Sequence, residues 1–206
     1  MNRKKTLLGM SCLCLSNLLS TSMVDAQVAP PKNIGTTPEE IRRISQEPGA
    51  VVFSPPKGWY LADSNALPPH VRVMVVGKGS YEFPPSINLS TEEFEGTIKD
   101  YLRIVKEINH SQGSEWKDLG TIRTAAGEGS LSQADAITEW GPIRMMHVIL
   151  PRNGVIYILT AAALRDEFPR FYKTFFESLR SLRINQDPEE MADVQALPSD
   201  MEWGYS

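Results

Sequence analysis

Residues 143–162, which read IRMMHVILPRNGVIYILTAA, decide the fold of this chain. Two apolar runs rich in β-branched residues, 143–150 and 155–162, flank Pro151-Arg152-Asn153-Gly154. Runs of this length and composition are typical of strands, and Asn-Gly suits the positive φ angles of a tight hairpin turn. We therefore expect an antiparallel β-hairpin in this part of the chain.

Shorter apolar runs upstream of the hairpin predict further strands. They cover residues 50–53, 59–61, 70–76, 86–89, 116–125 and 134–140, with a turn at 127–130 between the last two. The first two runs are separated by a Pro-Pro-Lys-Gly segment and suggest strand, turn, strand. Because the run at 70–76 is apolar almost throughout, we expect helices on both faces of the sheet.

Two amphipathic helices are predicted to cover the sheet. The first should begin at Ser90, whose hydroxyl can cap it while Glu93 reaches back, and should end near residues 110–113. The second should begin at Asp166, with Pro169 in its first turn. Each has an apolar stripe: Phe94, Ile98, Leu102, Val105 and Ile108 in the first, and Phe168, Phe171, Phe175, Leu179 and Leu182 in the second.

The amino terminus has the pattern of an export signal. Basic Arg3-Lys4-Lys5 precedes an apolar run at 7–19, and small residues stand at −3 and −1 in Val24-Asp25-Ala26. We expect cleavage between Ala26 and Gln27, with a cut after Ser22 as the alternative. Residues 1–26 are therefore predicted to be a cleaved signal peptide.

Neither a spanning helix nor a lipid anchor is expected. The apolar run is shorter than the roughly 20 residues that a membrane-spanning helix needs. The residues before Cys12 and Cys14 fit a lipoprotein signal poorly. The mature chain should be periplasmic or secreted, with no stable membrane span.

Composition divides the mature chain into three parts. Residues 27–36 are rich in proline, glycine and threonine and should form a flexible leader. Residues 37–184 should form a single domain that opens with a short helix at Thr37-Pro38-Glu39-Glu40. Residues 185–206 carry acidic side chains and no basic one, which predicts a disordered tail.

The mature composition argues against several partners and chemistries. Cleavage leaves 18 basic and 24 acidic residues in 180, a net charge of −6. That charge disfavours nucleic acid and anionic lipid as the main partner. Because both cysteines lie in the removed segment, disulfides, thiol catalysis and thiolate metal sites are excluded as well.

No residue pattern predicts catalysis, a metal or a cofactor. His70, His110 and His147 are solitary, although a pairing of His70 with His147 across neighbouring strands is left open. The glycine pairs at 77–79 and 127–129 lack the other residues of a phosphate-binding loop, and no Gly-x-Ser-x-Gly elbow is present. We assign no catalytic, cofactor-binding or metal-ligating residue.

Clustered carboxylates and aromatic residues are the remaining candidates. The carboxylates are Glu92, Glu93 and Glu95, which could act as acid and base or bind calcium but are explained by the dipole of the predicted helix. The aromatic residues Trp59, Tyr60, Trp116 and Trp140 should either line a pocket or plug the ends of the sheet. In the acidic tail, Trp203 and Tyr205 are candidate docking residues.

The order of elements resembles the PsbP-like superfamily from about Val51 to Ile184. The most specific pieces are Phe53-Ser54-Pro55-Pro56-Lys57-Gly58-Trp59, Tyr157-Ile158-Leu159-Thr160 and the aromatic helix at 168–176. The superfamily includes extrinsic photosystem II subunits, a Ran-binding nuclear import factor and DcrB-like bacterial envelope proteins. The resemblance implies an α+β fold, an antiparallel sheet of about six strands with helices on both faces. These functions differ so much that the fold indicates little about activity.

Three functions are compatible with these patterns. The leading hypothesis is an exported, non-enzymatic binding or accessory protein of the bacterial cell envelope, which acts through contact with an envelope protein or complex. The second is a carrier or sensor of a small apolar ligand in a cleft between sheet and helix. The third is a hydrolase that uses His70 or His147 with a nearby carboxylate.

Cleavage after Ala26 can be measured directly. Protein recovered from the periplasm or medium of its own cells should have the intact mass of residues 27–206, because signal peptidase cuts after the small residue at −1. Intact-mass spectrometry also separates this product from the alternative, residues 23–206. Recovery of the uncut chain alone would contradict the export prediction.

Overall fold

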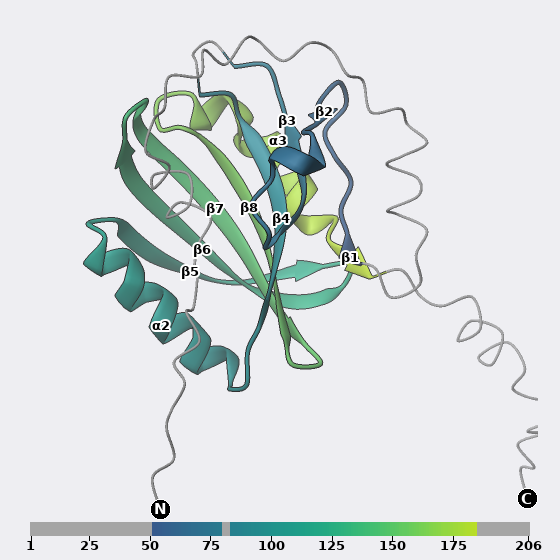
Figure 1. Cartoon of the computed structure of the whole chain (residues 1–206), viewed down its shortest axis with the longest axis vertical. Coiled ribbons are helices and arrows are strands. Elements are labelled where there is room, and N and C mark those ends of the chain that lie inside the picture. The colour runs from purple at the N-terminus through teal and green to yellow at the C-terminus, as the bar shows by residue number, and fades with distance from the viewer. Residues whose placement is uncertain (1–50, 80–82, 185–206) are drawn as a thin grey trace, which may run out of the picture.

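The computed structural model describes residues 51–79 and 83–184 (Figure 1). Over these ranges the chain forms a seven-stranded sheet, a two-stranded sheet and two α-helices. The predicted signal peptide, leader, first helix and acidic tail, with Trp203 and Tyr205, lie outside the described residues. None of the helices in the described part of the chain has the length and apolar character needed to cross a bilayer.

The main sheet is antiparallel throughout, in the order β2-β3-β4-β8-β7-β6-β5. Its strands are β2 (Tyr60–Leu61), β3 (Val71–Val76), β4 (Ser86–Glu93), β5 (Glu115–Thr124), β6 (Gly127–Thr138), β7 (Gly141–Arg152) and β8 (Val155–Leu164). A 3-10 turn, η1 (Ser64–Ala66), joins β2 to β3. The predicted α+β class is confirmed, with seven strands in this sheet instead of about six.

The predicted hairpin is formed by β7 and β8. Their register runs from Ile143 opposite Leu164 to Arg152 opposite Val155. The turn residues Asn153 and Gly154 have φ angles of 50° and 76°, the positive values that a tight hairpin turn requires. Because residues 155–162 of β8 also pair with the whole of β4, the hairpin connects the early strands to the late ones.

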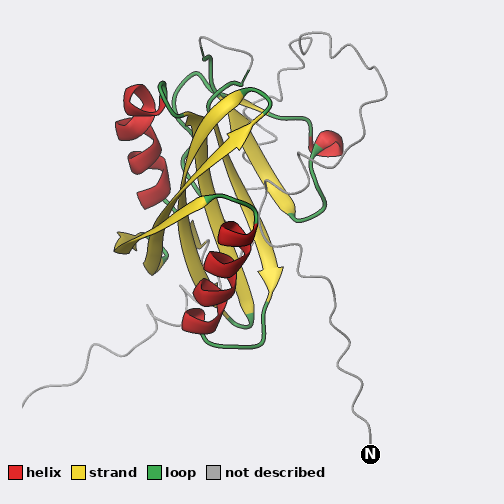
Figure 2. Cartoon of the chain, turned by 90° about the vertical axis from the view of Figure 1, so that its left-hand side faces the viewer, coloured by secondary structure: helices red, strands yellow, loops and turns green. Residues whose placement is uncertain are grey.

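The two helices, α2 (Ile98–Ser111) and α3 (Phe168–Arg180), pack on opposite faces of the sheet (Figures 1 and 2). Successive side chains of a strand point to opposite faces, so neighbouring residues of β7 enter different cores. Val148 packs in the core under α3, whereas Ile149 packs in the core under α2. The prediction of helices on both faces is confirmed.

Helix α2 begins later than the sequence predicted. Ser90 and Glu93 lie in β4, where they pair with Ile158 and Val155 of β8. The N-cap of α2 is instead Thr97, whose Oγ1 accepts a hydrogen bond from the backbone N–H of Asp100 at 3.2 Å. The capping-box spacing at Ser90 was misleading because pairing with the long strand β8 extends β4 through it.

Two smaller predictions are also corrected. Residues 127–130 belong to β6, because Thr124 pairs with Gly127 and the turn is only two residues long. The second helix starts at Phe168, so Asp166 is not its cap. The expected strands on either side of Pro55-Pro56 are both present, but they do not pair with each other. Instead, β1 (Val51–Val52) pairs with β9 (Arg183–Ile184), and β2 pairs with β3.

An aromatic core fills the space between α3 and the sheet. Phe175 is fully buried there, and the ring of Trp59 meets it edge-on at 6.0 Å between centroids. The backbone of Gly77 lies directly against Trp59, where a Cβ would come within 2.5 Å of the indole ring. Close packing of this kind leaves little room for change.

Truncation of Phe175 should therefore be costly. Phe175→Ala is expected to lower the free energy of unfolding by about 3–5 kcal/mol, because it leaves a cavity in a closely packed core. Urea unfolding followed by circular dichroism measures this loss. Lys173→Ala on the same helix is the matched control, since its side chain is 88% exposed. Equal losses for both variants would contradict the packing described here.

Candidate functional site

A row of polar side chains crosses the face of the sheet on which α2 packs. The strand register places Asp118, Ser132, His147, Thr160 and Asn88 opposite one another on β5, β6, β7, β8 and β4. All but Asp118 are buried. Buried polar groups of this kind cost free energy unless they find hydrogen-bond partners, so their arrangement has to be accounted for atom by atom.

His147 is the most perturbed group in this row. It is 1% exposed, and its Nδ1 lies 3.0 Å from Oγ1 of Thr160. Its ring stacks on the indole of Trp116, with centroids 5.4 Å apart and planes 17° from parallel. Burial lowers the pKa of His147 to about 4, so the imidazole is neutral near pH 7.

Two buried atoms of the row have no hydrogen-bond partner among residues 51–79 and 83–184. They are Nε2 of His147 and Oγ of Ser132. A buried polar atom left unsatisfied costs about 1–3 kcal/mol. The two unsatisfied atoms belong to neighbouring residues, because Ser132 stands opposite His147 in the register of β6 and β7.

A cavity of about 320 Å³ lies between α2 and the strands β5 and β6. It is lined by Leu102, Arg103 and Lys106 from α2, Trp116 and Asp118 from β5, and Ser130 and Ser132 from β6. The cavity therefore adjoins the polar row, and one of its lining residues carries an unsatisfied buried hydroxyl. An apolar wall with a few polar groups is the usual make-up of a small-molecule site.

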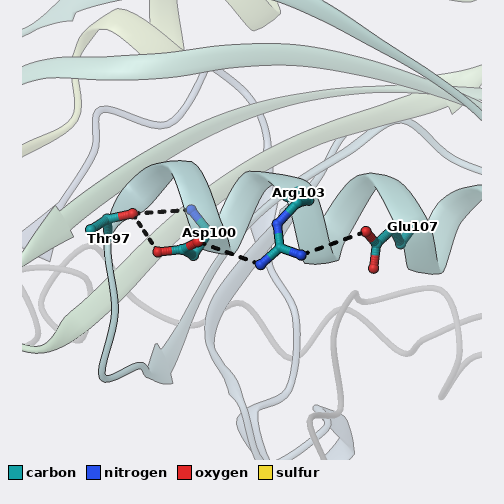
Figure 3. Close-up of polar contacts among 4 residues, drawn as sticks. All are labelled: Thr97, Asp100, Arg103 and Glu107. Carbon is teal, nitrogen blue, oxygen red and sulfur yellow. Dashed lines mark hydrogen bonds and ion pairs between the residues drawn. The ribbon is translucent and has the colours of Figure 1, made fainter.

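Exposed polar contacts run along α2 (Figure 3), and one of the residues that make them, Arg103, lines the cavity. Thr97 Oγ1 donates to Oδ2 of Asp100 at 2.7 Å, and this hydrogen bond lowers the pKa of Asp100. Arg103 lies between Asp100 and Glu107, at 3.4 Å and 4.0 Å from their carboxylate oxygens. Because these pairs are exposed, they stabilise the helix only weakly. Their main effect is to orient Arg103 along α2.

Asp118 and Lys106 complete the charged groups around the cavity. Asp118 accepts a hydrogen bond from the backbone N–H of Gly120 at 2.8 Å, at the bulge in β5. Lys106 is exposed on α2, and no ion pair of Lys106 is recorded with any described residue. The lining thus contains two cationic side chains and one carboxylate.

The histidine hypotheses are settled by topology and burial. His70 precedes β3, and β4 and β8 lie between β3 and β7, so His70 and His147 are not on neighbouring strands. His110 is exposed in the last turn of α2. The recorded side-chain partner of His147 is the hydroxyl of Thr160, not a carboxylate. The described geometry therefore gives His147 no acid that would orient it as a base.

The glutamate cluster does not stand at a helix end. Glu92 and Glu93 lie in β4, and Glu95 lies between that strand and α2. Oε2 of Glu92 accepts a hydrogen bond from the hydroxyl of Tyr101 at 2.8 Å. The predicted dipole interaction is therefore wrong, because β4 continues where the helix was expected to begin.

The four candidate aromatic residues have different surroundings. Trp116 lines the cavity, whereas Trp59 packs into the core under α3. Tyr60 and Trp140 are exposed, and Trp140 contacts Phe83 with ring centroids 5.7 Å apart. The prediction of a pocket-lining role thus agrees with the structure for Trp116.

No sequence pattern identified Ser130, Ser132 or Lys106 as site residues. The two serines alternate with the buried residues Gly129 and Leu131, which is the two-residue period of a strand. Assigning residues 127–130 to a turn concealed this alternation. The position of Lys106 beside the two serines depends on helix packing and has no local signal.

Comparison with known proteins gives similarity at the level of the fold. No family model and no curated protein matches the sequence. LpqN of Mycobacterium tuberculosis, a protein involved in cell envelope biogenesis, is 15% identical with a TM-score of 0.49, over 74% of this chain and 99% of LpqN. PA94 of Pseudomonas aeruginosa, a protein of unknown function, is 14% identical with a TM-score of 0.47, over 64% and 95% of the two chains.

A third solved structure belongs to the superfamily that the sequence resembles. It is cyanobacterial PsbP from Synechocystis sp. PCC 6803, which is 11% identical to this chain. The TM-score is 0.42, over 77% of this chain and 99% of PsbP.

The buried state of His147 makes stability depend on pH. The unfolded histidine titrates near pH 6.5 and the folded one near 4, so the unfolded state binds more protons between these values. The free energy of unfolding should fall as the pH drops from 6.5 to 4, by up to about 1.4 kcal/mol per pH unit. This contribution is fully present above pH 6.5.

Chemical denaturation at a series of pH values tests this expectation. His147→Gln should reduce the slope between pH 6.5 and 4, because glutamine does not titrate there. His110→Gln, a change at an exposed histidine, should leave the slope unchanged. An unaltered slope in His147→Gln would show that other groups control acid stability.

Proposed function

We propose that this chain is an exported, non-catalytic binding protein of the bacterial cell envelope, which holds a small ligand between α2 and the sheet. The observation that carries the proposal is the cavity next to the polar row. Its volume of about 320 Å³ lies at the lower end of the range of small-molecule sites, roughly 300–1,000 Å³. The amino-terminal export pattern supports the location.

The unsatisfied hydroxyl of Ser132 supports a binding role. The position is 0% exposed, and an alanine there would avoid the cost of an unpaired hydroxyl. A ligand that enters beside Ser132 can supply a hydrogen-bond partner and remove that cost. A polar group of the ligand would therefore account for a serine at this position.

Contact with an envelope protein, the leading hypothesis from the sequence, remains a prediction. Its candidate docking residues, Trp203 and Tyr205, lie outside the described residues. The ten-residue edge strand β5 is a poor template for another strand, since it carries charged residues and a bulge. The charged residues are Glu115, Lys117, Asp118 and Arg123. Addition of a partner strand to this edge is therefore disfavoured.

Native mass spectrometry of the mature chain, purified gently from its own cells, tests the proposal. The wild-type chain should carry the extra mass of a small molecule that is lost on denaturation. Ser130→Phe, which places a ring in the cavity, should be recovered without this mass. Glu128→Phe is the matched control, because Glu128 is an exposed residue of the same strand outside the cavity.

The outcomes separate clearly once folding of each variant is verified by circular dichroism. Loss of the extra mass in Ser130→Phe alone supports binding in the cavity. A wild-type chain recovered bare, or a folded Ser130→Phe chain that keeps the extra mass, would contradict the proposal.

A further inference from the structure

We infer that the ligand of this cavity is a small anion with a flat apolar body, such as an aromatic carboxylate. The inference rests on the proposed binding function and names the chemical class of the ligand. It differs from the small apolar ligand expected from the sequence by the negative charge of the ligand. Three features of the lining carry it: an aromatic wall, a cationic rim and hydroxyl groups on the sheet side.

Trp116 provides the aromatic wall. Its indole is held in place by stacking on His147, whose ring is buried and hydrogen-bonded to Thr160. Leu102 of α2 adds an apolar surface from the helix. A ring positioned in this way favours a planar group that can stack or pack against it. A flat apolar body therefore fits this part of the cavity.

Lys106 and Arg103 provide the cationic rim. The two side chains come from adjacent turns of α2 and both line the cavity. Arg103 forms ion pairs with Asp100 and Glu107, whereas no ion pair of Lys106 with a described residue is recorded. A ligand anion would find in Lys106 a charged hydrogen-bond donor, and such bonds are stronger than neutral ones.

Asp118 does not reverse this preference. Its Oδ1 already accepts the hydrogen bond from Gly120, and the two cations leave the lining with a net positive charge. A cationic ligand would face Lys106 and Arg103 together, which like-charge repulsion disfavours. Because Asp100 and Glu107 pair with Arg103, Lys106 is the cation of the lining that remains to attract a ligand anion.

The serines on the sheet side select a ligand with polar atoms. Ser130 and Ser132 lie on the same face of β6, two residues apart. The hydroxyl of Ser132 can donate to a carboxylate oxygen, which would satisfy the buried atom that is otherwise without a partner. The cavity then offers both cationic side chains and hydroxyl groups to the carboxylate of the ligand.

Titration of the mature chain with 2-naphthoate and its neutral isostere 2-naphthamide tests the charge requirement. Isothermal calorimetry should give an affinity for 2-naphthoate about tenfold or more above that for 2-naphthamide, since a charge-assisted hydrogen bond distinguishes them. In ¹⁵N spectra, the indole N–H signal of Trp116, assigned with Trp116→Phe, should shift on addition of 2-naphthoate.

Lys106→Gln is the decisive variant, because Lys106 is exposed and its replacement should not affect folding. It should weaken 2-naphthoate about tenfold while leaving 2-naphthamide unchanged. Lys99→Gln removes the same charge from an exposed position on the same helix outside the cavity and is the matched control. It should bind both compounds as the wild type does.

Two results would overturn the inference and bear differently on the proposed function. Equal affinities for the two compounds, both lost in Ser130→Phe, would refute the anion preference and leave small-molecule binding in the cavity intact. No binding of either compound would refute the ligand class. The native-mass comparison, which uses the cell's own ligand, would then decide separately whether the cavity binds any small molecule.

Discussion

The pairing of β7 with β8 is the constraint on which the rest of the structure depends. Their side chains alternate between two faces, so Val148 and Leu159 face α3 while Ile149 and Ile158 face α2. The Asn153-Gly154 turn holds this register. A slip of one residue would exchange the two faces and leave both helices without their apolar partners. The hairpin thus determines both cores at once.

The same register creates the polar row and places it at the candidate site. His147 stands between Met146 and Val148 along β7, opposite Thr160 on one side and Ser132 on the other. Tyr101 and Val105 of α2 pack over the apolar end of this face. The next positions of the helix, Leu102 and Lys106, then lie over β5 and β6, where the cavity forms.

The two faces of the sheet differ in character, and the difference matches the proposed function. The α3 face is filled by aromatic rings, including Phe175 and Trp59, that meet one another directly. The α2 face buries a neutral histidine and a serine hydroxyl that lack full hydrogen bonding within the described residues. A sheet face that supplied stability alone would be served better by apolar residues there. The polar face is therefore the one on which ligand binding is proposed.

Elements that depend on interactions between neighbouring residues could be predicted from the sequence. Alternating and continuous apolar runs indicated most strands, the Asn153-Gly154 turn indicated the hairpin, and the aromatic stripe indicated α3. Where local signals competed with distant pairing, they failed. Ser90 had the spacing of a cap yet lies in β4, and residues 127–130 had the composition of a turn yet lie in β6.

Only the tertiary structure decided which residues form the site. Ser132, His147 and Thr160 are separated by 13 to 15 positions along the chain and become neighbours through strand register alone. Lys106 reaches the same place because α2 packs across β5 and β6. The physical reason is that a cavity is enclosed by surfaces from distant segments, whereas sequence patterns report the preferences of one segment at a time.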